Sequence, residues 1–380
     1  DNNCDGGDLS CQLELDLAGS HARMYGHFSY DYAGTSVSMG GDVNGDGVND
    51  VLIGGYGNDV YSNSSGMIYL LHGSVSGNLS LPTTADARLY GVNIRDYAGY
   101  DVNIIPDVNA DGYDDILVGA YGFDKVGTPD IPDAGATYLI HGPISGDISL
   151  DQAAAIVVGE DEEDFSGWAT VGGADFSGDG SANDILIGAY NADESGLNGP
   201  GVVYLMQGPH SGEIDLGTAQ ARFIGESNFD YAGYDVDFGD VNGDGIDDAI
   251  IGAYGHDGGG NASGGAYVVH GPFSGDIDLY YAEGKYKGEG SFHFAGQSIS
   301  NAGDFNGDGL DDIIVGATGE DSLATQAGAA YVLFGPAETV TTQDIGTADV
   351  KYVGNNDLSY AGWSVAPCND VNGDGASDLI

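Results

Sequence analysis

Short apolar runs bounded by glycine recur along the whole chain. Runs such as Val51-Leu52-Ile53 and Ile185-Leu186-Ile187 consist of aliphatic and mostly β-branched residues, which is typical of buried strands. Other segments, such as residues 35–39, alternate small polar and apolar residues, as a strand does when one face is buried. No helical period accompanies either pattern. The sequence therefore predicts an all-β protein.

The predicted strands come in a fixed order. An alternating first strand (35–39) leads into an acidic loop, and a buried second strand (51–54) follows it. A third strand covers 67–72 and a short fourth strand covers 87–91, with turns between them. Equivalent segments recur in later repeats, including a Gly-Pro-x-Ser-Gly-Asp turn after the third strand. Short strands joined by tight turns predict a β-propeller made of four-stranded antiparallel blades.

The acidic loop at residues 42–50 has the pattern of a calcium-binding turn. Asp42, Asn44, Asp46 and Asp50 occupy positions 1, 3, 5 and 9, and Gly47 occupies position 6, where the backbone must turn sharply. Position 7 can offer a backbone carbonyl. Calcium takes six to eight oxygen ligands, which such alternating side chains can supply. An EF-hand is excluded because its Glu at position 12 is replaced by Ile53.

The loop occurs six times, with starting positions 64 to 68 residues apart. A repeat of this length with several strands is typical of a propeller. Several carboxylates within one short loop repel one another unless a cation neutralises them, so we expect about six Ca²⁺ ions with a mainly structural role. A metal-free, Asx-rich hairpin is the alternative. The predicted ligands are Asp42, Asn44, Asp46, Val48, Asp50, Asp107, Asn109, Asp111, Tyr113, Asp115, Asp175, Ser177, Asp179, Asp184, Asp240, Asn242, Asp244, Ile246, Asp248, Asp304, Asn306, Asp308, Leu310, Asp312, Asp370, Asn372, Asp374, Ala376 and Asp378.

The third loop departs from the pattern. It has Ser177 at position 3 and one inserted residue. We therefore expect Asp184, rather than Asn183, to be its last ligand, and the site to be weaker or distorted. After the second strands, a polar loop has an Asp at matching places, and we expect this residue to cap a turn: Asp59, Asp124, Asp193, Asp257 and Asp321.

The charge restricts the possible partners. The chain has 8 Lys and Arg against 60 Asp and Glu, with a formal net charge of −52. Nucleic acids and anionic membrane surfaces are bound through cationic patches, so both are excluded as partners. No apolar run approaches the roughly 20 residues that span a bilayer, so no membrane insertion is expected in this segment.

Three motifs in fixed order resemble the FG-GAP repeat of the integrin α-subunit propeller and its secreted bacterial relatives. They are aromatic-Ala-Gly, as at Tyr32-Ala33-Gly34, then the acidic loop, then Gly-Ala-Tyr, as at Gly188-Ala189-Tyr190. The resemblance implies calcium in the hairpin loops between first and second strands, aromatic packing between blades, extracellular or cell-surface work, and seven blades, of which six repeats are visible.

The ends of the sequence suggest a longer chain. Residues 22–26 match a fourth strand, and residues 379–380 stop inside a second strand. We therefore expect residues 7–380 to form one propeller that is truncated at its C-terminal end, and part of a larger chain or assembly. Residues 1–6 resemble the end of an upstream linker or Cys/Asp-rich motif. Cys4 and Cys11 could close a small disulfide loop, or all three cysteines could be free thiols.

The leading functional hypothesis is a secreted or surface-displayed module for adhesion or ligand binding, with an extracellular protein or glycan as ligand. The variable loops at 122–135 and 191–201 are the expected contact surface. A structural role in an extracellular matrix, sheath or filament is one alternative. The accessory propeller of an extracellular hydrolase is another. We expect no enzymatic activity, because the sequence has no nucleophile elbow, zinc-protease motif or phosphate loop.

Overall fold

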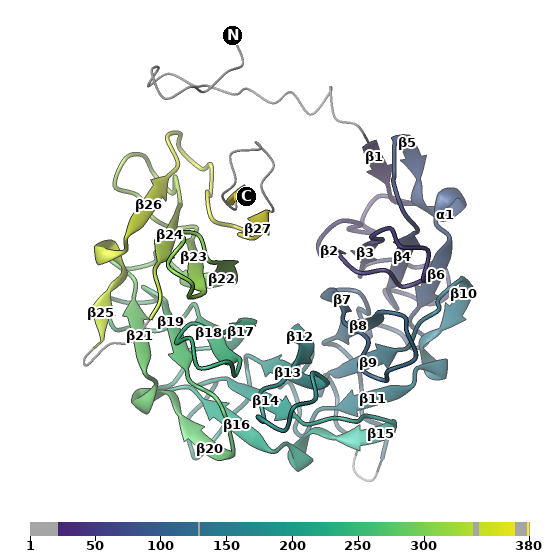
Figure 1. Ribbon diagram of the computed structural model, residues 1–380, viewed down its shortest axis with the longest axis horizontal. Helices are drawn as coiled ribbons and strands as arrows, with labels where there is room; N and C mark the ends of the chain where they lie inside the picture. Colours follow the sequence, from purple (N-terminus) through teal and green to yellow (C-terminus); the bar gives the residue numbers. More distant parts are fainter. Residues whose placement is uncertain (1–21, 128–129, 337–341, 369–377, 380) are drawn as a thin grey trace.

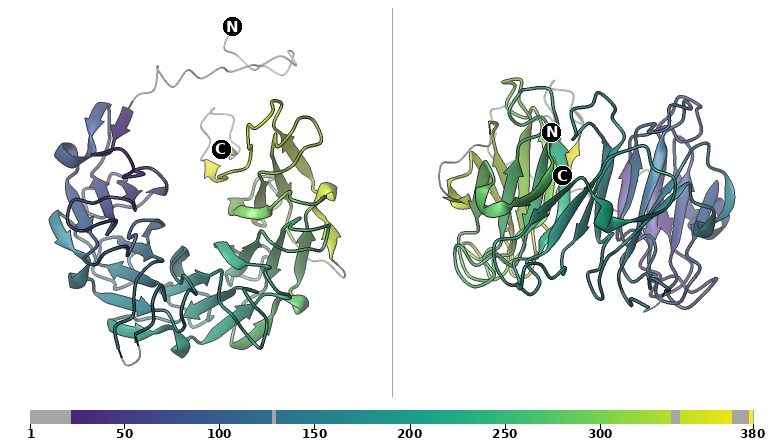
Figure 2. Two further views of the ribbon diagram at one scale, coloured as in Figure 1. Left: turned by 180° about the vertical axis from the view of Figure 1, so that it is seen from behind. Right: turned by 90° about the horizontal axis from the view of Figure 1, so that it is seen from below.

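The computed structural model describes residues 22–127, 130–336, 342–368 and 378–379. Its blades follow one another along an arc around a central axis (Figures 1 and 2). First strands line the inside of the arc, and the fourth strands lie outside. The strand pairs β1–β5 and β27–β28 lie at its two ends. The structure confirms a β-propeller of antiparallel blades.

Five blades contain the four antiparallel strands that the sequence predicts, and two described strands lie at each end of the arc. The first strands are β2 (Val37–Met39), β7 (Val102–Ile105), β12 (Ala169–Ala174), β17 (Ala232–Gly239), β22 (Ala295–Gly303) and β27 (Pro367–Cys368). The second strands are β3 (Val51–Gly55), β8 (Asp115–Ala120), β13 (Asp184–Ala189), β18 (Asp248–Ala253), β23 (Asp312–Ala317) and β28 (Asp378–Leu379). The third strands are β4 (Met67–Leu71), β9 (Ala136–Ile140), β14 (Val202–Met206), β19 (Gly265–Val269) and β24 (Ala329–Leu333). The fourth strands are β1 (Ala22–Tyr25), β6 (Ala87–Tyr90), β11 (Ala155–Val158), β16 (Ala221–Ile224), β21 (Gly284–Lys287) and β26 (Val350–Val353).

The structure adds a fifth strand that the sequence did not predict. The end of the expected Gly-Pro-x-Ser-Gly-Asp turn is itself a strand, and it pairs in parallel with the fourth strand of the preceding blade. Each repeat therefore extends along the outer edge of its neighbour. The fifth strands are β5 (Gly77–Ser80), β10 (Gly146–Ser149), β15 (Gly212–Asp215), β20 (Gly275–Asp278) and β25 (Gln343–Asp344). A single turn of helix follows each: α1 (Leu81–Thr84), η2 (Leu150–Gln152), η3 (Leu216–Thr218), η4 (Leu279–Tyr281) and η5 (Ile345–Thr347).

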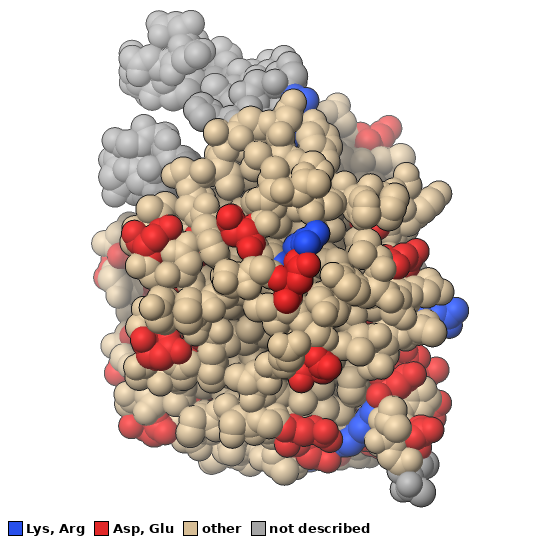
Figure 3. Space-filling model, turned by 90° about the vertical axis from the view of Figure 1, so that its right-hand side faces the viewer, with Lys and Arg blue, Asp and Glu red and all other residues tan. Residues whose placement is uncertain are grey.

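Ion pairs strengthen this outer edge. Arg88 on β6 contacts Asp147 on β10 at 2.7 Å, and Arg222 on β16 contacts Asp276 on β20 at 2.8 Å. Each pair is directly opposite across the parallel strands. The few cations of the chain are therefore used partly to join neighbouring repeats. On the outer face shown in Figure 3, basic side chains are few and acidic ones lie in several separate places.

The core lies between adjacent blades. Residues of β3, β8, β13, β18 and β23 are buried on both faces. One cluster joins Leu52 and Ile68 of the first blade to Val102 and Ile116 of the second. Neighbouring blades thus share their apolar faces, and no blade buries its core alone.

Two glycines meet wherever two blades touch. A Cβ added at Gly188 on β13 would overlap the carbonyl oxygen of Gly233 in the next blade. Gly54, Gly119, Gly252 and Gly316 stand in the same relation to Gly99, Gly167, Gly296 and Gly362. The second strand and the aromatic-Ala-Gly segment therefore approach each other more closely than any side chain allows.

We predict that Gly188→Ala lowers the free energy of unfolding by about 3 kcal/mol or more, because the blades must separate to admit the methyl group. Gly275→Ala is the control. Its added Cβ meets nothing within 4 Å, and its φ of +71° should cost only about 1–2 kcal/mol. Urea denaturation measures both losses. Equal losses would show that the close approach of the blades can relax.

Candidate functional site

The first acidic loop lies between β2 and β3 and is fixed by hydrogen bonds to its own side chains. Asp42 Oδ1 accepts bonds from the amides of Gly45 and Asp46 at 2.7 and 3.0 Å, and its Oδ2 accepts one from Gly47 at 2.7 Å. The bond from the Gly47 amide is the largest cause that lowers the pKa of Asp42. Gly47 has a φ of +83°, a left-handed conformation that glycine adopts without strain.

A buried carboxylate ends each described loop. Asp50, Asp115, Asp184, Asp248 and Asp312 are all fully buried. Each accepts one bond from an amide at the start of its loop and another from a glycine amide after the third strand, as Asp50 does from Val43 and Gly73. Burial raises the pKa of Asp248 to about 6. A cation bound beside such a carboxylate would offset the cost of its burial.

The loops offer the oxygen donors that calcium prefers, namely carboxylates, an amide oxygen at position 3 and a backbone carbonyl at position 7. In the third loop Ser177 replaces the amide, and the position-7 carbonyl of Ser181 accepts a bond from the Asn183 amide at 2.8 Å. Within the part of the chain that the structure describes, however, no group of three or more Asp, Glu, His and Cys side chains is close enough together to hold a metal ion. Backbone amides satisfy the carboxylates in this conformation. The donor chemistry therefore fits calcium, and binding remains a prediction. The sixth loop, from Asp370 to Ala376, lies outside the described residues, as do Cys4 and Cys11.

The irregular third loop keeps its anchor. Asp184 Oδ2 accepts a bond from the Ser177 amide at 3.0 Å, and Oδ1 accepts one from Gly208 at 3.1 Å. This is the place that Asp50 holds in the first loop, so the inserted residue is absorbed before Asp184. Asn183 points elsewhere: a Cβ on Gly208 would overlap its side chain.

The predicted turn caps are confirmed in four repeats. Asp59, Asp124, Asp193 and Asp257 each accept a backbone amide bond of 2.6–2.9 Å from within their own loop. In the fifth repeat, Asp321 instead lies 3.5 Å from the His293 ring. These residues shape the loops between second and third strands.

The opposite face of the propeller is aromatic. The acidic loops follow the first strands, whereas the aromatic residues precede those strands or end the second strands, and so lie at the other end of each blade. Tyr32 stacks on Tyr56 at 5.0 Å, and Tyr56 contacts Tyr97 of the next repeat at 6.1 Å. Similar contacts continue from blade to blade as far as Phe294. We call this surface the aromatic face. The predicted aromatic packing between blades is confirmed.

Exposed residues with strained backbones edge the aromatic face. Tyr30, Phe229 and Phe292 have φ values of 75°, 63° and 64° and are 77, 55 and 53 % exposed. Leu358 holds the same position in the sixth repeat, with a φ of 59°. Arg95 and Glu163 hold this position in the second and third repeats, with φ values of 65° and 61°, so the backbone conformation belongs to the repeat and only the apolar side chains are particular to the other four. Four large apolar side chains are thus held in solvent around one face.

A central cavity of 610 Å³ lies inside the ring of first strands. Its lining includes Tyr100, Trp168, Trp363 and the carboxylates of Asp101 and Asp235. These carboxylates join adjacent blades: Asp101 accepts a bond from the Thr170 amide at 2.7 Å, and Asp235 accepts one from the Ile299 amide at 2.8 Å. This role was not predicted from the sequence. The signal was present, because each acid stands two residues after the Gly of aromatic-Ala-Gly.

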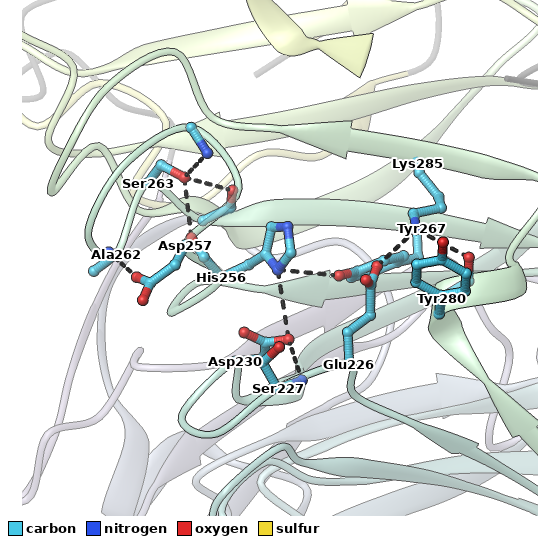
Figure 4. Close-up of polar contacts among 12 residues, drawn as sticks. Glu226, Ser227, Asp230, His256, Asp257, Ala262, Ser263, Tyr267, Tyr280 and Lys285 are labelled. Carbon is cyan, nitrogen blue, oxygen red and sulfur yellow. Dashed lines mark hydrogen bonds and ion pairs between the residues drawn. The ribbon is translucent and has the colours of Figure 1, made fainter. Parts of the chain in front are cut away.

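A polar network in the fourth blade resembles a catalytic arrangement and is better explained by packing (Figure 4). His256 Nδ1 lies 3.3 Å from the Tyr267 hydroxyl and 3.4 Å from Asp230 Oδ2. The residue at the place of His256 is Asn58 in the first repeat, which contacts Tyr69 in the same way. In the second repeat it is Phe123, against Tyr138. A position that tolerates Asn, Phe and His fills space beside a tyrosine.

The FG-GAP repeat family matches residues 33–71 and 295–333. Phosphatidylinositol-glycan-specific phospholipase D of Bos taurus is 30 % identical over 232 residues, covering 58 % of this chain and 26 % of that protein. Integrin alpha pat-2 of Caenorhabditis elegans is 34 % identical over 106 residues, covering 27 % of this chain and 8 % of that protein. The match therefore spans about a quarter of the phospholipase and less than a tenth of the integrin. The Dos1 propeller structure aligns with 80 % of this chain and 59 % of its own, at 10 % identity and a TM-score of 0.39.

We predict that the Asp235 carboxyl makes the protein less stable as pH rises. Burial raises the pKa of Asp235 to about 8, whereas in the unfolded chain it is about 4. Between these values the folded state binds more protons, so the free energy of unfolding falls with pH, by at most about 1.4 kcal/mol per unit. Asp235→Asn removes this slope while keeping an acceptor for Ile299.

Thermal melts of both proteins from pH 5 to 9 check this. The stability difference should shift in favour of the variant as pH increases. Asp276→Asn is the control. The hydrogen bond from Arg222 lowers the pKa of Asp276, so its carboxyl is ionised in both states across this range. If the stability of Asp235→Asn changes with pH in the same way as that of the parent protein, Asp235 does not titrate as predicted.

Proposed function

Because the chain is an FG-GAP-repeat β-propeller that resembles the propeller of integrin α-subunits, we propose that it is an extracellular, calcium-stabilised module that binds a ligand on its aromatic face. The observation that supports this most directly is the exposed edge of that face. Tyr30, Phe229, Phe292 and Leu358 remain in solvent on strained backbones. Phe229 lies 6.1 Å from Tyr231 and Phe292 lies 6.3 Å from Phe294, so these exposed rings continue the aromatic face, and exposed apolar surface of this kind marks interaction sites.

The loops between second and third strands extend the same surface. The 191–201 loop reaches the neighbouring repeat, where the Phe229 amide donates to the Asn198 carbonyl at 2.8 Å. Of the two loops that the sequence suggested as contact surface, the 191–201 loop thus borders an exposed apolar residue, whereas the 122–135 loop borders Glu163, whose amide donates to the Pro132 carbonyl at 3.1 Å. A ligand placed there would contact rigid, blade-supported residues and sequence-variable loops together. No described helix is long and apolar enough to cross a membrane.

In this proposal the acidic loops hold calcium at the opposite face and keep the blades in register. Asp42, Asn44, Asp46 and Asp50 would hold the ion in the first loop, with the Val48 carbonyl. The chemistry that calcium supplies is charge compensation for carboxylates that the fold buries or crowds. We assign no catalytic role to the propeller itself.

The likeness to the bovine phospholipase favours a second candidate, an accessory propeller attached to an extracellular hydrolase. That arrangement requires a hydrolase domain on the same polypeptide. The complete coding sequence tests this candidate directly. If it encodes no hydrolase domain, the ligand-binding module is the function that stands.

We predict that calcium removal lowers the melting temperature. A site that binds tenfold tighter than the free calcium concentration stabilises the fold by about 1.4 kcal/mol, so several loops together contribute several kcal/mol. Differential scanning calorimetry with calcium and with excess chelator measures this. Unchanged melting in chelator would contradict a structural role for the ion.

Calorimetric titration assigns the sites. Asp240→Asn combined with Asp244→Asn should reduce the number of bound calcium ions by one. The control, Asp59→Asn, changes a turn cap that accepts the Ser64 amide and should leave the number unchanged. A full complement of ions in the double variant would show that the acidic loop is not the site.

We predict that Phe229→Ala with Phe292→Ala weakens ligand binding without lowering the melting temperature, because both side chains are more than half exposed. Arrays of extracellular matrix proteins and glycans, probed with calcium present, identify the ligand first. The control is Tyr281→Ala, whose side chain is 74 % exposed on η4 at the outer edge. If only Tyr281→Ala weakens binding, the ligand binds at the outer edge and not on the aromatic face.

A further inference from the structure

Two polar residues, Thr318 and Gln297, interrupt the aromatic face in the fifth repeat. At the place of Thr318, after the second strand, the other repeats have Tyr56, Tyr121, Tyr190 and Tyr254. At the place of Gln297, after the Gly of aromatic-Ala-Gly, four of the other five repeats have Tyr100, Trp168, Tyr234 and Trp363. Interiors are close-packed, so the loss of two large rings at one spot leaves a hollow.

That hollow is a pocket of 270 Å³ between the fourth, fifth and sixth repeats. Tyr254, Phe294, Tyr360 and Trp363 contribute aromatic rings to its lining. The rings of Tyr254, Phe294 and Tyr360 also belong to the aromatic face, so the pocket opens to solvent on that face. Small-molecule sites usually measure roughly 300–1,000 Å³, and the pocket is therefore suited to a single small ring.

The polar groups of the pocket are held in place. Thr318 Oγ1 donates to Gln297 Oε1 at 2.6 Å, and the Tyr360 hydroxyl donates to Gln326 Oε1 at 3.4 Å. Both bonds use the oxygen of an amide, and each amide keeps two N–H donors for other partners. Thr318 is buried, with 4 % of its surface exposed. The aromatic rings are thus accompanied by preorganised neutral donors.

The absence of charged side chains from the lining disfavours ionic ligands. Among the residues that the structure describes, no Asp, Glu, Lys, Arg or His side chain lines this pocket, although the chain has 60 acidic residues. Asp101 and Asp235 line the neighbouring central cavity instead. Aromatic rings attract cations, but a cation here would lack a carboxylate partner. An anion would be repelled by a net charge of −52.

The remaining class is a neutral ring that has one apolar face and a polar edge. A pyranose has this shape, because its C–H bonds can lie on an aromatic ring while its hydroxyls reach amide and hydroxyl groups at the rim. We propose that the pocket beside Thr318 binds one neutral pyranose unit, so that the ligand of the aromatic face is a neutral glycan. This inference rests on the proposed function and names the chemistry that the aromatic face recognises.

The test uses substitutions that other repeats already contain. Thr318→Tyr restores the tyrosine found in four repeats and fills the pocket, so it should fold and lose sugar binding. The control, Thr218→Tyr, introduces the same ring on η3, at the place where η4 has Tyr281, and Thr218 lines neither this pocket nor the central cavity. Gln326→Leu is the second variant, which removes an amide and keeps the volume.

Binding of methyl α-glucopyranoside, methyl β-galactopyranoside, methyl α-mannopyranoside and N-acetylglucosamine is measured by saturation-transfer NMR and by Trp363 fluorescence, with Trp168→Phe as background. At least one sugar should bind in the millimolar range, and Thr318→Tyr and Gln326→Leu should each weaken it at least tenfold, or 1.4 kcal/mol. Thr218→Tyr should not change it.

Three results would overturn the inference: no sugar binds, the two pocket variants bind as the parent protein does, or tetramethylammonium competes with the sugar. The macromolecular ligand of the aromatic face provides the separate check. If that ligand still binds to Thr318→Tyr and is lost in the Phe229 and Phe292 variant, the proposed function stands and the sugar pocket fails. If it binds to both, the proposed function fails as well.

Discussion

The contact between paired glycines is the constraint on which the propeller depends. At each blade junction the backbone of a second strand lies against the carbonyl of the next aromatic-Ala-Gly segment, as at Gly188 and Gly233. The same glycine of that segment also binds its own blade: the Gly99 amide donates to the Gly119 carbonyl at 2.9 Å. One residue thus fixes both the shape of its blade and the distance to the previous one. The glycines of the repeat motif follow from this geometry.

Close approach of the blades determines the rest of the arrangement. Because the second and third strands are covered on both faces, they can be wholly apolar, and the polar groups move to the ends and to the axis. At the axis, Asp101 and Asp235 accept amide bonds from the next first strand. They replace the ladder of backbone bonds that two separate sheets cannot form. Their burial raises the pKa of both carboxyls, so the stability of the ring is coupled to pH.

Much of the fold could be predicted from the sequence, because repetition made each signal visible several times. The strands, the acidic hairpins and the turn caps at Asp59 and its equivalents all followed from spacing. The fifth strand was missed because residues 146–149 contain a turn motif and few apolar residues. Its pairing with β6 depends on a neighbouring repeat, which a local pattern cannot reveal. The aromatic face was foreseen only as packing, since nothing in the sequence separates a buried Tyr from one such as Tyr30 that the backbone holds in solvent.

The same repetition separates structure from function. A residue that recurs in every blade has a structural role that every blade requires, such as the glycine contact or the anchor at Asp50 and Asp184. Where one repeat has a different residue, although the residue of the other repeats would fit there, the difference indicates a role particular to that repeat. His256 departs and merely fills space beside Tyr267, because Asn58 and Phe123 do the same elsewhere. Thr318 and Gln297 depart together, contact each other and open a pocket. Packing alone does not explain both changes at one junction, because Thr318 stands where four other repeats have Tyr, and Gln297 stands where four other repeats have Tyr or Trp. The clearest departure of this propeller from its own repeat pattern therefore lies on the aromatic face of the fifth repeat.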